Sequence, residues 1–178
     1  YIEAGQPIRP IQPEWDVFSR AWNEGDLAGR FTVSFVTTVI ITGAQVLTSL
    51  LAAYAFVFLR FPLKRVLFAL FMTTLMLPIE VTLLVNVVTI RNLDWLNSYQ
   101  ALTAPFLAAA FGTFLIRQGF LGIPGDLRDA AELDGLGHLG FLRNVAVPVT
   151  RPIIASFTVV AFLAAWNQYT WPRAVVTE

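Results

Sequence analysis

The sequence has no cysteine, a single histidine and few charged residues, and each shortage excludes a class of chemistry. Without cysteine the chain has no disulfides, no thiol nucleophile and no cysteine-ligated metal site. His138 stands alone, so no metal-binding cluster of histidines is available. Lys and Arg balance Asp and Glu at 12 each, and the zero net charge argues against a nucleic-acid partner. No G-x-x-x-x-G-K-[ST] sequence occurs, so the chain carries no P-loop for nucleotide hydrolysis.

Long apolar runs dominate what is present. Hydrophobic residues make up 56% of the chain and charged residues 13%, against a soluble average of about 25% charged. Windows with few or no ionisable residues lie at 31–59, 66–90, 95–116 and 152–172. Each reaches the roughly 20 residues that a helix needs to cross about 30 Å of hydrocarbon. The polar remainder of the chain is too short to cover all of them, so we predict an all-α membrane protein with helices spanning at these windows.

Basic residues near the span ends predict the orientation. Two links are rich in basic residues. The link between the first two predicted spans holds Arg60, Lys64 and Arg65, and the link between the last two, residues 118–150 with their flanks, holds Arg117, Arg128, Arg143 and Arg151. Because cytoplasmic loops are enriched in Lys and Arg, both links are predicted to be cytoplasmic. Residues 1–30, with a short helix around 15–22, and the link 92–100 would then lie outside, and 173–178 would begin another outer loop. The chain starts without methionine, signal peptide or lead-in span, so we expect a fragment that lacks sequence at both ends.

The inner link 118–150 contains a polar helix between predicted spans. Pro124 suits its first turn, and Asp126 and Asp129 place negative charge near its positive end. Gly135 is expected to end the helix in the left-handed conformation. A second short helix around 139–145 would lead to Pro148 and the next span.

The first helix is predicted to expose small and apolar residues, surrounded by acids. These are Leu127, Ala130, Ala131 and Leu133, with Asp129, Glu132 and Asp134 close by. An ordinary amphipathic helix on the membrane surface is the alternative, but such helices usually carry Lys and Arg toward anionic lipid. The acidic character therefore favours docking of a protein partner.

Glu80 is the one acid within the predicted spans. An acid at membrane depth is costly and faces a cavity or a partner, and Pro78 nearby interrupts the helix. Glu80 is therefore interpreted either as a pathway residue that binds a hydroxyl or a choline-like cation, or as a structural acid bonded to a neighbouring helix. Proton coupling is a third interpretation, although no second intramembrane acid or histidine accompanies it.

The other polar groups near membrane depth are Asn86, Asn167 and Gln168. Amide side chains suit sugar or glycerol hydroxyls, but they also tie helices together. Trp166, Tyr169 and Trp171 would stack on a ligand or form an interfacial aromatic belt, and the belt is favoured for them. Gly43, Ala52, Ala53 and Gly112 are interpreted as helix-packing positions.

The run D-A-A-E-L-D-G at 129–135, followed by V-A-V-P at 145–148, resembles the cytoplasmic "EAA" loop of ABC-importer membrane subunits. Asp129 stands where that family usually has Glu, and Val147 where Leu is common before Pro148. Further strings resemble the carbohydrate-uptake, maltose permease-like branch: A-A-Y-A-F-V-F-L-R-F-P-L, L-M-L-P-I-E-V, F-L-I-R-Q-G-F and A-W-N-Q-Y-T-W-P. L-P-I-E-V and W-N-Q-Y-T-W-P most resemble the permease of the glycerol-3-phosphate and glycerophosphodiester importer.

The resemblance implies the permease fold of ABC importers, with the second to fifth of six spans in this chain. It implies a bacterial inner-membrane subunit that works with a sister permease, two nucleotide-binding ATPases and an external solute-binding protein. ATP and Mg would be used by the ATPases, and this chain would bind no cofactor. The loop would form a coupling helix that engages an ATPase through Leu127, Asp129, Ala130, Ala131, Glu132, Asp134, Gly135 and Pro148. Glu80, Asn86, Trp166, Asn167 and Gln168 would line the path of a small polar solute.

Two functions compete on the sequence. The first is an importer permease that moves glycerol-3-phosphate, a glycerophosphodiester such as glycerophosphocholine, or a sugar. The second is an ion- or proton-coupled secondary carrier or a channel that uses Glu80. The docking helix favours the importer, since a carrier needs no such element.

Overall fold

The computed structural model describes residues 17–24 and 26–177, and every regular element among them is helical. The α-helices are α1 (Val17–Glu24), α2 (Leu27–Phe58), α3 (Lys64–Thr73), α4 (Ile79–Asn92), α5 (Tyr99–Thr103), α6 (Ala110–Leu121), α7 (Gly125–Leu133), α8 (His138–Phe141), α9 (Val147–Val149), α10 (Arg151–Trp166) and α11 (Thr170–Val175). Thr74–Met76 and Ala104–Phe106 are 3₁₀ turns, and Leu142–Ala146 is a π turn. The all-α prediction is confirmed for the described residues.

The chain divides into two compact units, Tyr1–Ser34 and Phe35–Glu178. In the first unit α1 occupies Val17–Glu24, where the sequence predicts a short helix around 15–22. Residues 1–16, the rest of the predicted outer loop, lie outside the described residues. The predicted start of an outer loop at 173–178 is helical instead over the first part, because α11 continues to Val175.

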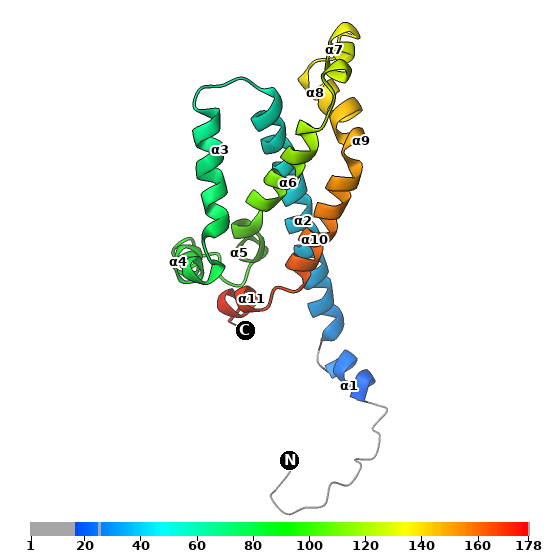
Figure 1. The fold of residues 1–178 in the computed structure, drawn as a ribbon. Helices are drawn as coiled ribbons and strands as arrows, with labels where there is room; N and C mark the ends of the chain where they lie inside the picture. Colours follow the sequence, from blue (N-terminus) through cyan, green and yellow to red (C-terminus); the bar gives the residue numbers. More distant parts are fainter. Residues whose placement is uncertain (1–16, 25, 178) are drawn as a thin grey trace, which may run out of the picture. The chain divides into compact units, whose positions relative to one another are not determined.

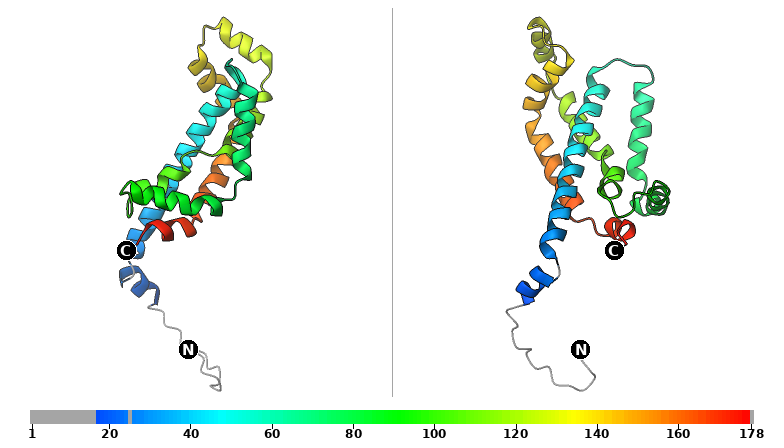
Figure 2. Two further views of the ribbon diagram at one scale, coloured as in Figure 1. Left: turned by 90° about the vertical axis from the view of Figure 1, so that its left-hand side faces the viewer. Right: turned by 180° about the vertical axis from the view of Figure 1, so that it is seen from behind.

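In the second unit, α3, α6, α10 and the continuation of α2 run between two ends (Figure 1). The α7 and α8 helices lie at one end, and α4, α5 and α11 gather at the other, as two further views also show (Figure 2). The turn after α2 reaches the α7 end, since residues 58–61 line one hollow together with Arg128 and His138. The two links predicted to share a side therefore do so.

Among residues 17–24 and 26–177, one helix, α2, is long and apolar enough to cross a membrane, and up to four spans result if each bent helix pair counts as one. The pairs bend by 98° between Met76 and Val81, by 44° between Phe106 and Ala110, and by 81° at Thr150. The interruption that Pro78 predicts in the window 66–90 is thus present, whereas the breaks in the windows 95–116 and 152–172 were not predicted. The 81° bend at Thr150 lies before the last window, in which α10 ends at Trp166 and α11 begins at Thr170. Pro78 stands in extended backbone before α4, and Pro105 lies in the 3₁₀ turn before α6. Proline cannot donate the amide hydrogen bond that a continuous helix requires.

The break between α5 and α6 frees backbone carbonyls that α2 satisfies with side chains. Three polar side chains of α2 donate hydrogen bonds to the backbone of this break. The bonds run from Gln45 Nε2 to Phe106 O at 2.8 Å, from Thr48 Oγ1 to Leu107 O at 3.1 Å and from Ser49 Oγ to Ala109 O at 3.2 Å. An unpaired carbonyl in an apolar environment is costly, so these bonds allow non-helical backbone at this depth. The i, i+3, i+4 spacing of these residues in an apolar helix is the sequence signal for these bonds, and Gln45, Thr48 and Ser49 were not among the predicted functional or packing residues.

We expect Gln45→Leu to lower the melting temperature of the detergent-purified protein. The change leaves the Phe106 carbonyl without this donor, at a cost of about 1–3 kcal/mol, which corresponds to a shift of roughly 2–10 °C. Gln118→Leu, the same change at an exposed position of α6, is the control and should leave the melting temperature in place. Equal shifts for the two variants would contradict the role of Gln45.

Tight packing joins α2, α6 and α10 in the middle of the unit. A Cβ on Gly112 would overlap Phe157 Cζ and the Ser49 hydroxyl, so the absence of a side chain at Gly112 lets α6 lie close against α2 and α10. Ala53 is fully buried nearby. Gly112 and Ala53 are thus confirmed as packing positions, whereas Gly43 is exposed, and a Cβ added there would have no atom of the described chain within 4 Å.

Candidate functional site

The α7 helix is the predicted docking helix, and its two ends follow the predicted chemistry. Pro124 is the N-cap residue, one position before the first turn, and Asp126 lies within that turn. Gly135 has φ of +75°, the left-handed conformation that glycine adopts without steric penalty. The amides of Gly135 and Leu136 donate to Glu132 O and Ala131 O at 3.1 and 2.9 Å. This pair of bonds is the Schellman motif, which satisfies carbonyls at the end of a helix.

One residue of the predicted docking surface faces the other way. Ala131 is only 4% exposed and belongs to the apolar core with Tyr54, Phe120 and Phe141, so its prediction as an exposed residue is wrong. The reason is that α7 lies on the ends of α2 and α6, and its single inward position takes the small side chain.

The remaining docking residues of α7 and its cap stay at the surface. Leu133 is 88% exposed, and the others are Leu127, Asp129, Ala130, Glu132, Asp134 and Gly135. Arg128 Nε lies 3.3 Å from Glu132 Oε1 on this surface, an i, i+4 ion pair that contributes about 0.3–0.5 kcal/mol. The exposed surface is acidic and apolar at once, which suits a protein partner better than a lipid surface.

The second predicted helix is longer than 139–145 and runs from His138 to Val149. Its middle is the π turn Leu142–Ala146, directly before the turn that holds Pro148. Pro148 has no amide hydrogen to donate back along the helix, and a π turn is a common way to absorb such an interruption. At the corner before α10, buried Thr150 donates through Oγ1 to Ala146 O at 2.7 Å.

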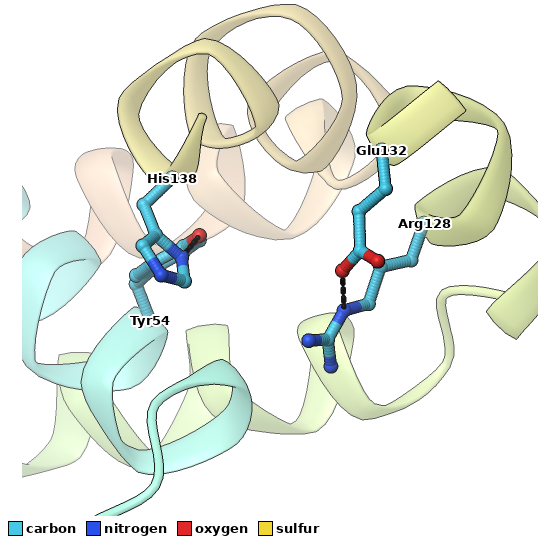
Figure 3. A network of polar contacts seen from close by, with 4 residues as sticks. All are labelled: Tyr54, Arg128, Glu132 and His138. Carbon is cyan, nitrogen blue, oxygen red and sulfur yellow. Dashed lines mark hydrogen bonds and ion pairs between the residues drawn. The ribbon is translucent and has the colours of Figure 1, made fainter. Parts of the chain in front are cut away.

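An aromatic cluster seats this end of the unit on α2 and α6. The Phe58 ring lies 5.0 Å from Tyr54, 5.1 Å from Phe141 and 5.7 Å from Phe120, measured between ring centroids. Tyr54 Oη lies 3.0 Å from His138 Nδ1, as Figure 3 shows beside the Arg128–Glu132 pair. Tyr54 and His138 were not among the predicted site residues, and no local pattern links positions 84 residues apart.

At the opposite end, the structure brings the predicted amide residues together. Asn86 from α4 lines one pocket of about 260 Å³ with Asn167 and Gln168, which follow α10. The other lining residues are Leu83, Phe106, Ala164, Tyr169, Thr170 and Trp171. Donors and acceptors beside aromatic rings are the combination that a small polyol or sugar requires.

Of the other two predicted pathway residues, the structure describes the side chain of Trp166 alone. Trp166 does not line this pocket and instead stacks on Phe162, with ring centroids 6.1 Å apart and planes 9° apart. The backbone of Glu80 lies in the first turn of α4, and its side chain is outside the described residues.

Trp171 is the anchor of this end. It is 5% exposed, and its Nε1 donates to Ala101 O at 3.0 Å, so the belt prediction is wrong for Trp171. Tyr169 is exposed, and its hydroxyl accepts a hydrogen bond from Arg173 Nη1 at 2.7 Å. Trp171 lines the pocket that contains Asn86, Asn167 and Gln168, and its hydrogen bond joins α11 to α5.

No group of three or more His, Asp or Glu residues in the described part of the chain is placed to hold a metal ion. A family model described as "Binding-protein-dependent transport system inner membrane component" matches residues 45–177. The chain belongs to this family. Since the matched residues run from α2 to α11, this inner membrane component includes both the docking end and the amide pocket within its family region.

Named relatives of this inner membrane component agree with the predicted branch of the family. The sn-glycerol-3-phosphate transport system permease protein UgpE of Yersinia enterocolitica is 38% identical over 92% of this chain and 60% of its own length. UgpE of Yersinia pestis is 37% identical over 99% of this chain and 65% of its own. UgpE of Salmonella typhi is 41% identical over 82% of this chain and 52% of its own. The chain thus spans about 60% of the length of the relatives it matches.

A solved structure shares the fold. A chain of a bacterial ABC transporter involved in the import of the acidic polysaccharide alginate superposes with a TM-score of 0.74 at 25% identity. The match covers 95% of this chain and 60% of that chain. The predicted permease fold of ABC importers is therefore confirmed.

Proposed function

We propose that this inner membrane component is a permease subunit of an ATP-driven importer, with α7 as the helix that receives motion from an ATPase. The observation that carries the proposal is the surface of α7: six of its docking residues and Gly135 face outward, while buried Ala131 packs the helix against the bundle and the capping bonds fix where the helix ends. A firmly seated helix with an outward acidic and apolar surface is suited to engage a partner and pass its displacement on.

The proposed partners follow from this role. Two ATPase subunits would bind and hydrolyse ATP with Mg, a sister permease would complete the pathway, and an external binding protein would deliver the solute. This chain would translocate without hydrolysis, consistent with the absence of a P-loop sequence. Pro148 and Thr150 would lead the motion from α9 into α10, whose first residue is Arg151.

The proposed solute is small and rich in hydroxyl groups, such as glycerol-3-phosphate, a glycerophosphodiester or a sugar. The amides of Asn86, Asn167 and Gln168 support it, because amide groups donate to and accept from hydroxyls at once. A phosphate would gain little from Glu80, because two negative charges repel each other.

The decisive experiment is an ATPase assay of the assembled transporter in nanodiscs. Glycerol-3-phosphate, glycerophosphocholine and a panel of oligosaccharides are added in turn with the binding protein. We expect one class to stimulate hydrolysis and to be taken up in ATP-loaded vesicles. Uptake that runs on an ion gradient without ATP would instead establish the alternative, a secondary carrier or channel that uses Glu80.

Replacing Glu80 separates the two functions further. We expect Glu80→Gln to change the rate or solute preference of uptake, roughly threefold or more, while uptake continues to require ATP. In a proton-coupled carrier the same change would abolish the pH dependence of uptake. Unchanged affinity and rate in vesicles would assign Glu80 a structural role.

A further inference from the structure

We propose that Tyr54 and His138 are positioning residues that hold the docking end to α2, so that α2 and α8 move as one body when α7 is displaced. This inference rests on the proposed function, because it concerns how the displacement of α7 reaches the bundle. It adds a second route beside the one that follows the chain through Pro148 into α10.

The route along the chain contains a sharp corner. The helix from His138 to Val149 meets α10 at Thr150 with a bend of 81°. Displacement passed through a corner of this kind depends on how stiff the corner is. A contact that reaches the bundle before the corner transmits the displacement directly.

The contact between Tyr54 and His138 lies before that corner. His138 is the first residue of α8 and lies four positions after Asp134, the C-cap residue of α7. Its Nδ1 lies 3.0 Å from Tyr54 Oη, and the two rings meet edge to face at 6.0 Å between centroids. Tyr54 is 7% exposed within α2, so its hydroxyl is held in place by its surroundings.

The hydrogen bond adds direction to a contact that is otherwise apolar. The aromatic cluster of Tyr54, Phe58, Phe120 and Phe141 attracts α8 to α2 without specifying one orientation, because burial of apolar surface is non-directional. A hydrogen bond is directional and specifies one register. Tyr54 and His138 also line a hollow of about 230 Å³ together with Arg128 and Glu132 (Figure 3). The ion pair on the exposed surface of α7 and the internal hydrogen bond therefore lie on the same hollow.

The test removes the hydrogen bond, and Tyr54→Phe does so while keeping both rings. In the complete transporter, Tyr54→Phe is expected to lower the number of solutes moved per ATP hydrolysed by roughly threefold to tenfold, the worth of one hydrogen bond. His138→Ala should do the same, and His138→Asn, whose amide occupies the place of Nδ1, should restore most of the loss. Tyr99→Phe makes the same chemical change at an exposed tyrosine of α5 and should leave the ratio unchanged.

A cross-link tests the shared movement directly. Since residues 1–178 contain no cysteine, Tyr54→Cys with His138→Cys provides the only two thiols within them, and a short bifunctional maleimide joins the pair. The unlinked double variant should move few solutes per ATP, and linking should restore the ratio. Loss of transport on linking would show that α2 and α8 separate during the cycle, which would overturn the proposal.

The failures of the two proposals are distinguishable. If the unaltered transporter shows no ATP-dependent uptake, the proposed function fails. If it does show such uptake and Tyr54→Phe matches it in solutes moved per ATP, only the positioning role fails.

Discussion

Replacing Gly112 with leucine is expected to prevent the permease from reaching a stable fold. A Cβ at this position overlaps the Phe157 ring and the Ser49 hydroxyl, and the larger side chain would have to occupy the place where α2, α6 and α10 meet. Ser49 also donates to Ala109 O at 3.2 Å, so its displacement frees a carbonyl at the break before α6. Overpacking costs about 1–3 kcal/mol, and the freed carbonyl adds about 1–3 kcal/mol. The measurement is the yield of monodisperse protein in detergent, expected to fall by about tenfold or more.

Further variants test whether the loss of yield comes from the contact between Gly112 and Phe157. Gly43→Leu places the same side chain on α2 at a position whose Cβ would have no atom of the described chain within 4 Å, and it should leave the yield of the isolated permease intact. Gly112→Ala should be milder than Gly112→Leu, and adding Phe157→Leu should recover part of its loss because the ring no longer fills the space. Additive losses in the double variant would mean that Gly112 and Phe157 do not interact.

The apolar windows predicted where helices occur and Pro78 predicted one interruption, but the break before α6 was not predicted. Proline was visible in the sequence at Pro78 and Pro105, yet proline also occurs within bent membrane helices. What permits a full break at residues 107–109 is the set of donors on α2, Gln45, Thr48 and Ser49. Their partners lie about 60 positions away in the sequence, so the break depends on tertiary contacts that no local pattern contains.

The same limit applies to the two ends of the unit. The end of α7 at Gly135 was predictable because a left-handed cap is a local requirement. The inward orientation of Ala131 was not, because it depends on which helices lie beneath α7. The meeting of Asn86 with Asn167 and Gln168 in one pocket likewise required the packing of α4 against α11. Trp171 contributes to that packing through its cluster with Ile90 of α4, from a position that the sequence assigned to the membrane interface.

Gly135→Val is expected to uncouple ATP hydrolysis from transport while the transporter still assembles. The left-handed φ of +75° is unfavourable for any residue with a Cβ by about 1–2 kcal/mol, and more for a β-branched one. A Cβ added there meets no atom of the described chain within 4 Å, so the strain in the backbone is the effect that this substitution is designed to introduce. Relief of that strain requires the turn to lose the bonds from Gly135 and Leu136 to the end of α7, which changes the angle at which α7 is presented.

The matched control lies two residues away in the same loop. Gly137 has φ of −71° and ψ of 177°, an extended conformation that valine adopts readily, and a Cβ there also meets no atom within 4 Å. Solutes moved per ATP should fall by about tenfold in Gly135→Val and stay within about twofold of the original in Gly137→Val. Co-purification of the ATPase subunits establishes that both variants assemble. If the two variants behave alike, the conformation of the cap does not matter for coupling, and α7 acts only as an anchor for the ATPase. If Gly135→Val alone loses transport, the cap conformation that sets the angle of α7 is needed for coupling, because both variants add the same side chain to the same loop and only Gly135 has a left-handed φ.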